Sequence, residues 1–374
     1  MSQFEVRLLG PPNEDIVRGF PGISASWPRL EGVVEIRTKD ETVPLQIAMV
    51  NLALYRTDVI HPPSNKPGIS GPRTDQSFRM GDEVRLFQVS AGRSYDEVMS
   101  MDLPFIIPLP TNRPLPPSIS LGKSTVETKY QLFVSIVYGK QQQYHEGFPV
   151  RIKRYDTLST FGAYKVPVVN TVPSLDHLVG FDYSLPISAY GPGDLIIAYI
   201  KIYPNIDWQK SKKVKLQRVT MQVIEVTTYN PDGEESVEKR RRLCKVAQQL
   251  DMKLPEKGYQ TEMSVDFPSI DLREKDNLIP KQRQDIPVVG RNGFTTASKL
   301  YKIEYILVLK ARFSHCKDIE IEQPITVSQF DHATCMSFMR SISEAVEYAN
   351  SVDRNRVPAP RIRRDRPSRA ILVG

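Results

Sequence analysis

The sequence predicts an all-β protein made of two β-sandwich domains, and three observations lead to this prediction. The chain has 374 residues, enough for about two or three typical domains. Thirty of them are prolines, about 8% against a usual share of about 5%, and proline ends helices. Many segments alternate apolar and polar residues with the period of two that marks a half-buried strand. Almost no helical pattern interrupts them, so we expect sandwiches rather than strands linked by crossover helices.

The clearest predicted strands lie at residues 130–138 and 301–309, where every second residue is apolar. Near Gln217 and Arg218 the apolar positions change parity, which predicts a β-bulge. The segment 195–203 is apolar on both faces and predicts a central strand. Turn sequences separate the strands: Gly191-Pro-Gly-Asp, Asn230-Pro-Asp-Gly and Arg291-Asn-Gly. We expect residues 56–79 and 275–298 to be long surface loops, because they are rich in proline and polar residues.

One amphipathic helix is predicted over residues 331–350, with Asp331 as its N-cap. Its apolar residues recur at helical spacing on one face: Cys335, Phe338, Met339, Ile342, Ala345, Val346 and Ala349. We expect this stripe to pack on the body of the same chain; a partner's groove and a membrane surface are the alternatives. The predicted order is therefore a sandwich over residues 1–160, a second over 161–330, the helix over 331–350, and a basic disordered tail over 351–374.

The positive charge of the chain is concentrated in that tail. The formal net charge is +7, and residues 351–374 hold seven arginines and two aspartates, a net of +5. The other 350 residues therefore carry only +2 (7 − 5), which argues against a nucleic-acid surface on the folded body. The candidate contacts to phosphate or anionic lipid are Lys210, Lys212, Lys213 and Lys215, near Trp208, and Arg361, Arg363, Arg364, Arg366 and Arg369 in the tail.

Known catalytic and metal-binding patterns are missing from the sequence. Gly122-Lys-Ser resembles the end of a phosphate-binding loop, but position 117 is proline where that motif needs glycine. The histidines and cysteines at 315, 316, 332 and 335 do not have the spacing of a closed zinc site. No serine lies in a Gly-x-Ser-x-Gly elbow, and no carboxylate pair is marked out for acid–base chemistry. We therefore expect no enzyme activity, cofactor or metal.

The composition predicts a cytoplasmic protein. The longest apolar run, residues 195–200, is far shorter than the ~20 residues needed to cross a bilayer. Glu5 and Arg7 interrupt the first apolar stretch, so no signal peptide is expected. Three widely spaced cysteines do not form a disulfide framework.

Short motifs, in a particular order, resemble the arrestin family over roughly residues 1–330. Leu103-Pro-Phe-Ile-Ile-Pro-Leu-Pro, Leu115-Pro-Pro-Ser-Ile and the strand with Tyr130-Gln-Leu are similar to the late part of the arrestin N-terminal domain. Tyr190-Gly-Pro-Gly-Asp-Leu-Ile and Tyr301-Lys-Ile-Glu-Tyr are similar to the C-terminal domain of fungal arrestin-domain proteins. The resemblance implies two immunoglobulin-like sandwiches and a non-catalytic adaptor or scaffold.

Such an adaptor would bind the cytosolic tails of membrane proteins in endocytosis, ubiquitin-dependent protein transport or signal transduction. It would lie in the cytoplasm, peripherally at the plasma membrane or endosomes, and would not bind nucleic acid. The α-arrestins recruit ubiquitin ligases through Pro-Pro-x-Tyr, which is absent here, so the resemblance leaves a ligase partner open. The alternatives are a structural subunit of a sorting coat, similar to the arrestin-like subunit of retromer, and an enzyme or carrier with an internal cavity.

Overall fold

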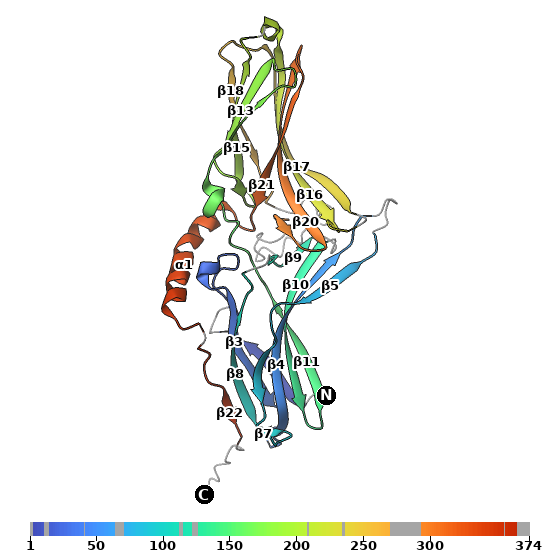
Figure 1. Ribbon diagram of the computed structural model, residues 1–374, viewed down its shortest axis with the longest axis vertical. Coiled ribbons are helices and arrows are strands. Elements are labelled where there is room, and N and C mark those ends of the chain that lie inside the picture. The colour runs from blue at the N-terminus through green and yellow to red at the C-terminus, as the bar shows by residue number, and fades with distance from the viewer. Residues whose placement is uncertain are drawn as a thin grey trace, which may run out of the picture.

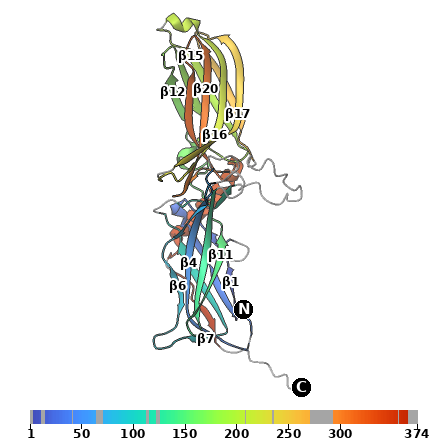
Figure 2. The same ribbon diagram turned by 90° about the vertical axis from the view of Figure 1, so that its right-hand side faces the viewer.

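The protein consists of two β-sandwiches arranged end to end along its long axis, with one long helix beside the junction (Figures 1 and 2). The computed structural model describes residues 3–10, 15–40, 42–63, 71–111, 115–121, 126–207, 209–233, 236–269, 293–354 and 356–364. This architecture confirms the predicted all-β fold with one C-terminal amphipathic helix. None of the helices among these residues is long and apolar enough to cross a membrane.

Two sheets form the N-terminal sandwich. One has the order β1 (Phe4–Leu9), β3 (Arg29–Thr38), β8 (Ser100–Pro108) and β22 (Arg361–Arg363), with β2 (Val17–Arg18) also pairing with β3. The other has the order β11 (Gln142–Val150), β10 (Val126–Tyr138), β4 (Leu45–Ile60) and β5 (Thr74–Arg79). Three shorter strands join the second sheet: β6 (Val84–Gln88) and β7 (Asp96–Val98) on β4, and β9 (Ile119–Leu121) on β10.

Two further sheets form the C-terminal sandwich. One has the order β12 (Val168–Pro173), β13 (Val179–Leu185), β15 (Leu195–Pro204) and β18 (Tyr259–Asp266). The other has the order β14 (Ala189–Tyr190), β21 (Ile319–Val327), β20 (Tyr301–Ser314), β16 (Lys215–Tyr229) and β17 (Val237–Lys253), with β19 (Thr296–Ala297) on β20. Three short 3-10 helices complete the described elements: η1 (Ser24–Ser26), η2 (Gly162–Lys165) and η3 (Gln209–Lys213).

The alternation of apolar and polar residues predicted the positions of strands, because successive side chains of a strand point to opposite faces of the sheet and only one face is buried. The predicted strands at 130–138 and 301–309 are confirmed as parts of β10 and β20. The predicted bulge is confirmed as well, since the pairing of β16 with both neighbours shifts between Leu216 and Arg218. Two of the predicted turns form, at Gly191–Asp194 and Asn230–Gly233. The third, at 291–293, lies largely outside the described residues.

One prediction about an individual segment is confirmed and one is wrong. The central strand predicted at 195–203 is β15, between β13 and β18, although Leu195 and Tyr199 on its outer face are about half exposed. We also expected a surface loop over residues 56–79, but β4 continues to Ile60 and β5 begins at Thr74. The polar side chains of these strands are typical of a loop, but here they form hydrogen bonds across the sheet or lie between the domains. Most of the other predicted loop, 275–298, lies outside the described residues.

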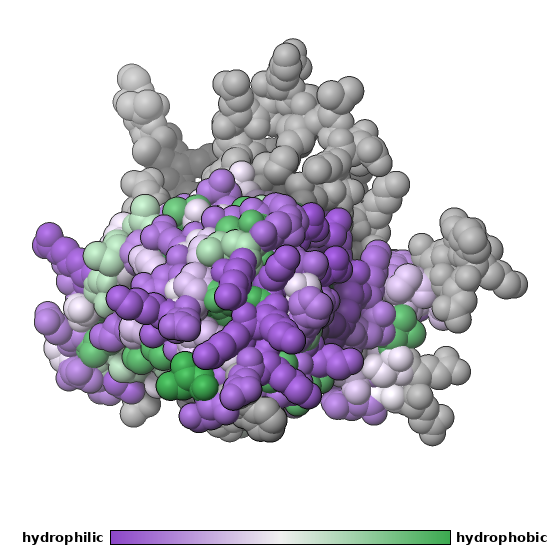
Figure 3. Space-filling view, turned by 90° about the horizontal axis from the view of Figure 1, so that it is seen from above, coloured by the Kyte–Doolittle hydropathy of each residue, from purple (hydrophilic) through white to green (hydrophobic). Residues whose placement is uncertain are grey.

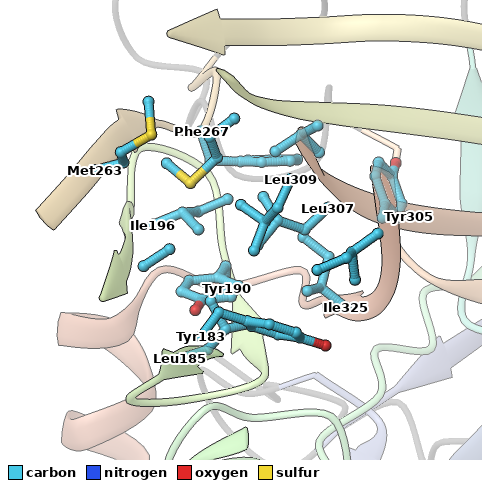
Figure 4. Close-up of a cluster of buried hydrophobic side chains, with 14 of the residues drawn as sticks. Tyr183, Leu185, Tyr190, Ile196, Met263, Phe267, Tyr305, Leu307, Leu309 and Ile325 are labelled. Carbon is cyan, nitrogen blue, oxygen red and sulfur yellow. The ribbon is translucent and has the colours of Figure 1, made fainter. Parts of the chain in front are cut away.

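Each sandwich has its own hydrophobic core. Figure 4 shows part of the C-terminal core, where Tyr183, Tyr190 and Tyr305 lie among aliphatic side chains from both sheets. Four residues of the N-terminal sandwich belong to the same cluster: Ile60, Ile119, Leu121 and Val126. The two domains therefore pack directly against each other at their junction, in addition to the covalent connection between β11 and β12.

The predicted helix is confirmed as α1 (His332–Ser351). The Asp331 side chain accepts a hydrogen bond from the backbone N–H of Thr334 at 2.7 Å, as expected of an N-cap. Cys335, Ile342 and Ala349 are buried on the body of the chain. This confirms intramolecular packing of the apolar stripe, in place of the partner or membrane alternatives.

Candidate functional site

Four turns meet at the end of the C-terminal sandwich that is farthest from the N-terminal domain, and we call this end the tip. The turn between β12 and β13 lies beside the segment after β15, because Asn205 donates one hydrogen bond from its backbone to Leu178 O and one from its side chain to His177 O, both at 2.9 Å. The β20–β21 turn joins them, since the backbone N–H of Lys317 donates to Asp176 Oδ2 at 2.9 Å. A backbone bond from Leu254 to Val214 O adds the turn after β17.

Asp176 joins two of these turns, β12–β13 and β20–β21, as a carboxylate. Partial burial acts to raise its pKa, but hydrogen bonds from Ser174, the Lys317 backbone and the Cys316 thiol outweigh this and lower the pKa to about 2. The carboxylate therefore stays ionised at neutral pH, and the tip is a connected structure rather than four independent loops.

The tip exposes two large aliphatic side chains beside a group of lysines. Leu175 is 87% exposed and Ile206 is 80% exposed. Lys210, Lys212 and Lys213 are exposed on η3, which follows Ile206 after a few residues. Figure 3, which views the molecule from this end, shows a mainly hydrophilic surface with isolated hydrophobic residues. Exposed aliphatic side chains beside lysines are suited to contact a membrane, whose interior is apolar and whose head groups can be anionic.

The predicted lysines and arginines lie at opposite ends of the molecule. Lys215, at the start of β16, is exposed close to η3, so the four lysines share the tip. Arg361, Arg363 and Arg364 lie on the N-terminal sandwich, near the other end of the long axis (Figure 1). Trp208, Arg366 and Arg369 lie outside the described residues. The lysines and the arginines therefore do not form one surface.

The expectation of a disordered tail is wrong for residues 361–363. They form β22, which pairs antiparallel with β8 between Arg361 and Asp102, Ile362 and Met101, and Arg363 and Ser100. Ile362 packs against the N-terminal core, and the Arg364 guanidinium donates to Asp96 Oδ2 at 2.9 and 3.2 Å. This strand was not predicted because it has a single apolar residue, Ile362, with an arginine on each side, which is too short to show a period of two. Residues 365–374 lie outside the described part of the chain.

A groove of about 680 Å³ lies beside β22 on the outer face of the β1–β3–β8 sheet. The tail residues Pro358 to Arg361 form one side, and the sheet contributes Leu9, Val33 and Ile106 among others. Glu31, Glu35 and Asp102 also line the groove. The edge of β8 and this groove together hold an extended, proline-containing segment of the chain.

A buried polar cluster lies between the two domains. Asp58 and Arg56, both on β4, form an ion pair at 3.2 Å, and they are 0% and 8% exposed. The Thr128 hydroxyl donates to Asp58 Oδ1 at 2.7 Å and lies 2.6 Å from the hydroxyl of Tyr301, at the start of β20. The Arg56 guanidinium also lies 4.6 Å from the ring centre of Phe78. This cluster joins the N-terminal sandwich to the C-terminal one.

Burial raises the pKa of Asp58 above its ordinary value, although hydrogen bonding by Thr128 and the charge of Arg56 act to lower it. This cluster does not follow from the sequence pattern, because Arg56 and Asp58 fall in a segment expected to be a loop. The available signal was the spacing of Leu54, Arg56 and Asp58, which continues the alternation of β4 on the buried face.

Within the described ranges, no group of three or more potential ligands is arranged to hold a metal ion. The imidazole of His332 lies 2.8 Å from the Ser159 hydroxyl, but Ser159 is buried and the bond joins α1 to the domain connection. Burial raises the pKa of the Cys316 thiol to about 11 and also raises that of Cys335. These residues are therefore explained by packing and hydrogen bonding.

Comparison with known protein families explains the C-terminal half of the chain. Residues 176–331 match the family described as arrestin (or S-antigen), C-terminal domain. The match begins in the turn between β12 and β13 and ends at Asp331, the N-cap of α1. No curated protein matches the sequence as a relative. Residues 176–331 thus form an arrestin C-terminal domain, which supports an arrestin-like family for the chain, and that family is generally non-catalytic.

Proposed function

We propose that this protein is a non-catalytic adaptor that rests its tip on an anionic membrane and binds cytosolic segments of membrane-protein cargo. The observation that carries the proposal is the pair of exposed aliphatic residues, Leu175 and Ile206, beside the exposed lysines of η3. The proposed setting is endocytic or ubiquitin-dependent sorting at the cytosolic face of the plasma membrane or endosomes.

The tip can supply both contributions that peripheral membrane binding needs. Burying a leucine or isoleucine side chain stabilises binding by about 1.5–3 kcal/mol. Each lysine close to an anionic leaflet adds about 1 kcal/mol, and salt screens this contribution. Two aliphatic anchors and three lysines, Lys210, Lys212 and Lys213, therefore support reversible, salt-sensitive binding.

The N-terminal sandwich supplies the proposed cargo site. An extended peptide can add to an exposed sheet edge through main-chain hydrogen bonds, with alternate side chains entering pockets. In this structure β22 uses the edge of β8 in that way, with Ile362 directed into the core. We propose that cargo segments bind at this edge and groove when the tail leaves them.

Vesicle sedimentation tests the membrane contact. The chain should sediment with phosphatidylserine vesicles, and binding should weaken as salt rises. Leu175→Asp with Ile206→Asp should lower the partition coefficient by roughly two orders of magnitude, because both aliphatic anchors are lost. Replacing Lys210, Lys212 and Lys213 with glutamine should remove most of the salt dependence.

The matched control replaces two exposed aliphatic residues elsewhere in the same domain, Val169→Asp with Leu195→Asp. This variant should bind vesicles like the parent. Equal loss in both variants would show that aliphatic residues outside the tip matter as much. Retention of binding by the tip variant, with loss on deletion of residues 356–374, would assign the membrane contact to the arginine tail instead.

A peptide titration tests the cargo site. A fluorescent peptide of residues 356–364 should bind a chain that ends at residue 355 and should bind the full chain much more weakly. Asp96→Arg should reduce binding to the truncated chain, because it removes the partner of Arg364. The control, Glu83→Arg, reverses an exposed acid on the same domain and should have no effect. Equal binding by the full and truncated chains would rule out this edge as the site.

A further inference from the structure

Helix α1 packs on a third hydrophobic cluster that is separate from both sandwich cores. We call it the hinge cluster, because its members come from the N-terminal domain, the connection between the domains, and the segment that follows β21. They are Ile23, Leu158, Phe330, Cys335 and Ile342, with Phe20, Tyr155, Phe161 and Phe338 packed around them. Figure 1 shows α1 beside the junction of the two sandwiches.

The first turn of α1 is attached to the C-terminal domain. The backbone N–H of His332 donates to Asp194 Oδ1 at 2.9 Å, and Asp194 belongs to the turn between β14 and β15. The chain enters the helix against the same turn, since a Cβ at Gly191 would overlap the carbonyl group of Phe330. This close approach leaves room only for glycine and fixes where the helix begins.

The last turns of α1 are attached to the N-terminal domain. The ring of Tyr348 lies 5.7 Å from the guanidinium of Arg29, which itself stacks at 3.9 Å over Trp27. Just beyond the helix, Arg354 donates to Ala349 O at 3.2 Å and lies 5.9 Å from the Trp27 ring. Arg29 and Trp27 belong to the start of β3 and the residues just before it.

Phe338, in the middle of the helix, joins the three regions. Its ring makes edge contacts with Phe330 at 5.0 Å, Tyr155 at 5.3 Å and Phe20 at 6.3 Å between ring centres. Phe20 lies in the N-terminal domain, Tyr155 in the domain connection, and Phe330 directly after β21. Aromatic pairs in this geometry are favourable and directional, so they restrain orientation as well as distance.

We infer that α1 is a clamp that fixes the angle between the two sandwiches. The domains are also joined where Thr128 meets Tyr301 and where Ile60 and Val126 pack into the C-terminal core. Two bodies attached at a single place can rotate about it, whereas a second attachment removes that freedom. The clamp therefore holds the tip and the β8 groove in a fixed relation, which goes beyond the proposed binding functions.

Distance measurements between spin labels test the clamp in the full chain. One label replaces the exposed Gln143 on β11 and the other replaces the exposed Glu262 on β18. Cys244→Ser and Cys316→Ser leave no partly exposed native thiol among the described residues. The parent should give one narrow distance distribution. Phe338→Ala should broaden it, while the circular-dichroism signal of the sheets is retained.

The matched control is Met336→Ala, on the exposed side of the same helix, and it should leave the distribution narrow. A second test variant, Tyr348→Ala with Arg354→Ala, removes the attachment to the N-terminal domain without changing the hinge cluster, and it should also broaden the distribution. Narrow distributions in both test variants would overturn the inference. Loss of the sheet signal in Phe338→Ala would do so too, because α1 would then be required for folding rather than for orientation.

Discussion

Replacing Phe338 and Ile342 with aspartate should lower the free energy of unfolding by about 3–5 kcal/mol, the size expected when large core side chains are lost. Ile342 is buried and Phe338 contacts three other aromatic rings. The variant loses this apolar burial, and a docked helix would have to bury two carboxylates without partners. The expected result is release of α1 and an earlier chemical denaturation midpoint.

The matched control places two aspartates four residues apart on the exposed side of the same helix, at Ser337 and Ser341. It adds the same charge and similar helix propensity but leaves the hinge cluster unchanged. The control should have a chemical denaturation midpoint close to that of the parent. If the Phe338 and Ile342 variant also denatured like the parent, the packing of α1 would contribute nothing to stability, and both this prediction and the clamp would lose their basis.

Replacing Arg56 with methionine should lower the free energy of unfolding by about 3–5 kcal/mol at neutral pH, because removal of one partner leaves a buried charge uncompensated. Asp58 is fully buried and pairs with Arg56 at 3.2 Å. Burial already raises the pKa of Asp58 in the folded protein. The folded state therefore holds the proton more tightly than the unfolded chain, and this carboxyl favours folding less as pH rises through its folded-state pKa.

The loss of unfolding free energy in the Arg56→Met variant should therefore become smaller as pH falls, because protonation of Asp58 removes the unpaired charge. Adding Asp58→Asn should restore part of the lost stability at neutral pH for the same reason. The control is Arg79→Met, an exposed arginine on the neighbouring strand β5, which should cost almost nothing. Denaturation midpoints measured across pH check both statements, and a pH-independent deficit would contradict the assignment to Asp58.

Local patterns in the sequence determined the class of the fold and most of its elements. The alternation in β10 and β20 identified strands because one side of each sheet is buried and the pattern repeats every two residues. The parity change in β16 identified a bulge for the same reason. The spacing in α1 and the capping chemistry of Asp331 are likewise contained within a few turns of chain. The resemblance in the C-terminal half was also visible in short motifs.

The tertiary structure alone decided which charged residues are bound and which are free. Arg364 pairs with Asp96, 268 residues away, and no local pattern encodes a strand pairing at that separation. Arg56 and Asp58 looked like loop residues, but the approach of Tyr301 from the other domain makes them an interface. The exposed Leu175 became a candidate contact only because the fold places its turn next to that of Ile206, at the same end of the sandwich as the lysines. Side-chain periodicity reports burial within one element, whereas these sites depend on distant elements that long-range packing brings together.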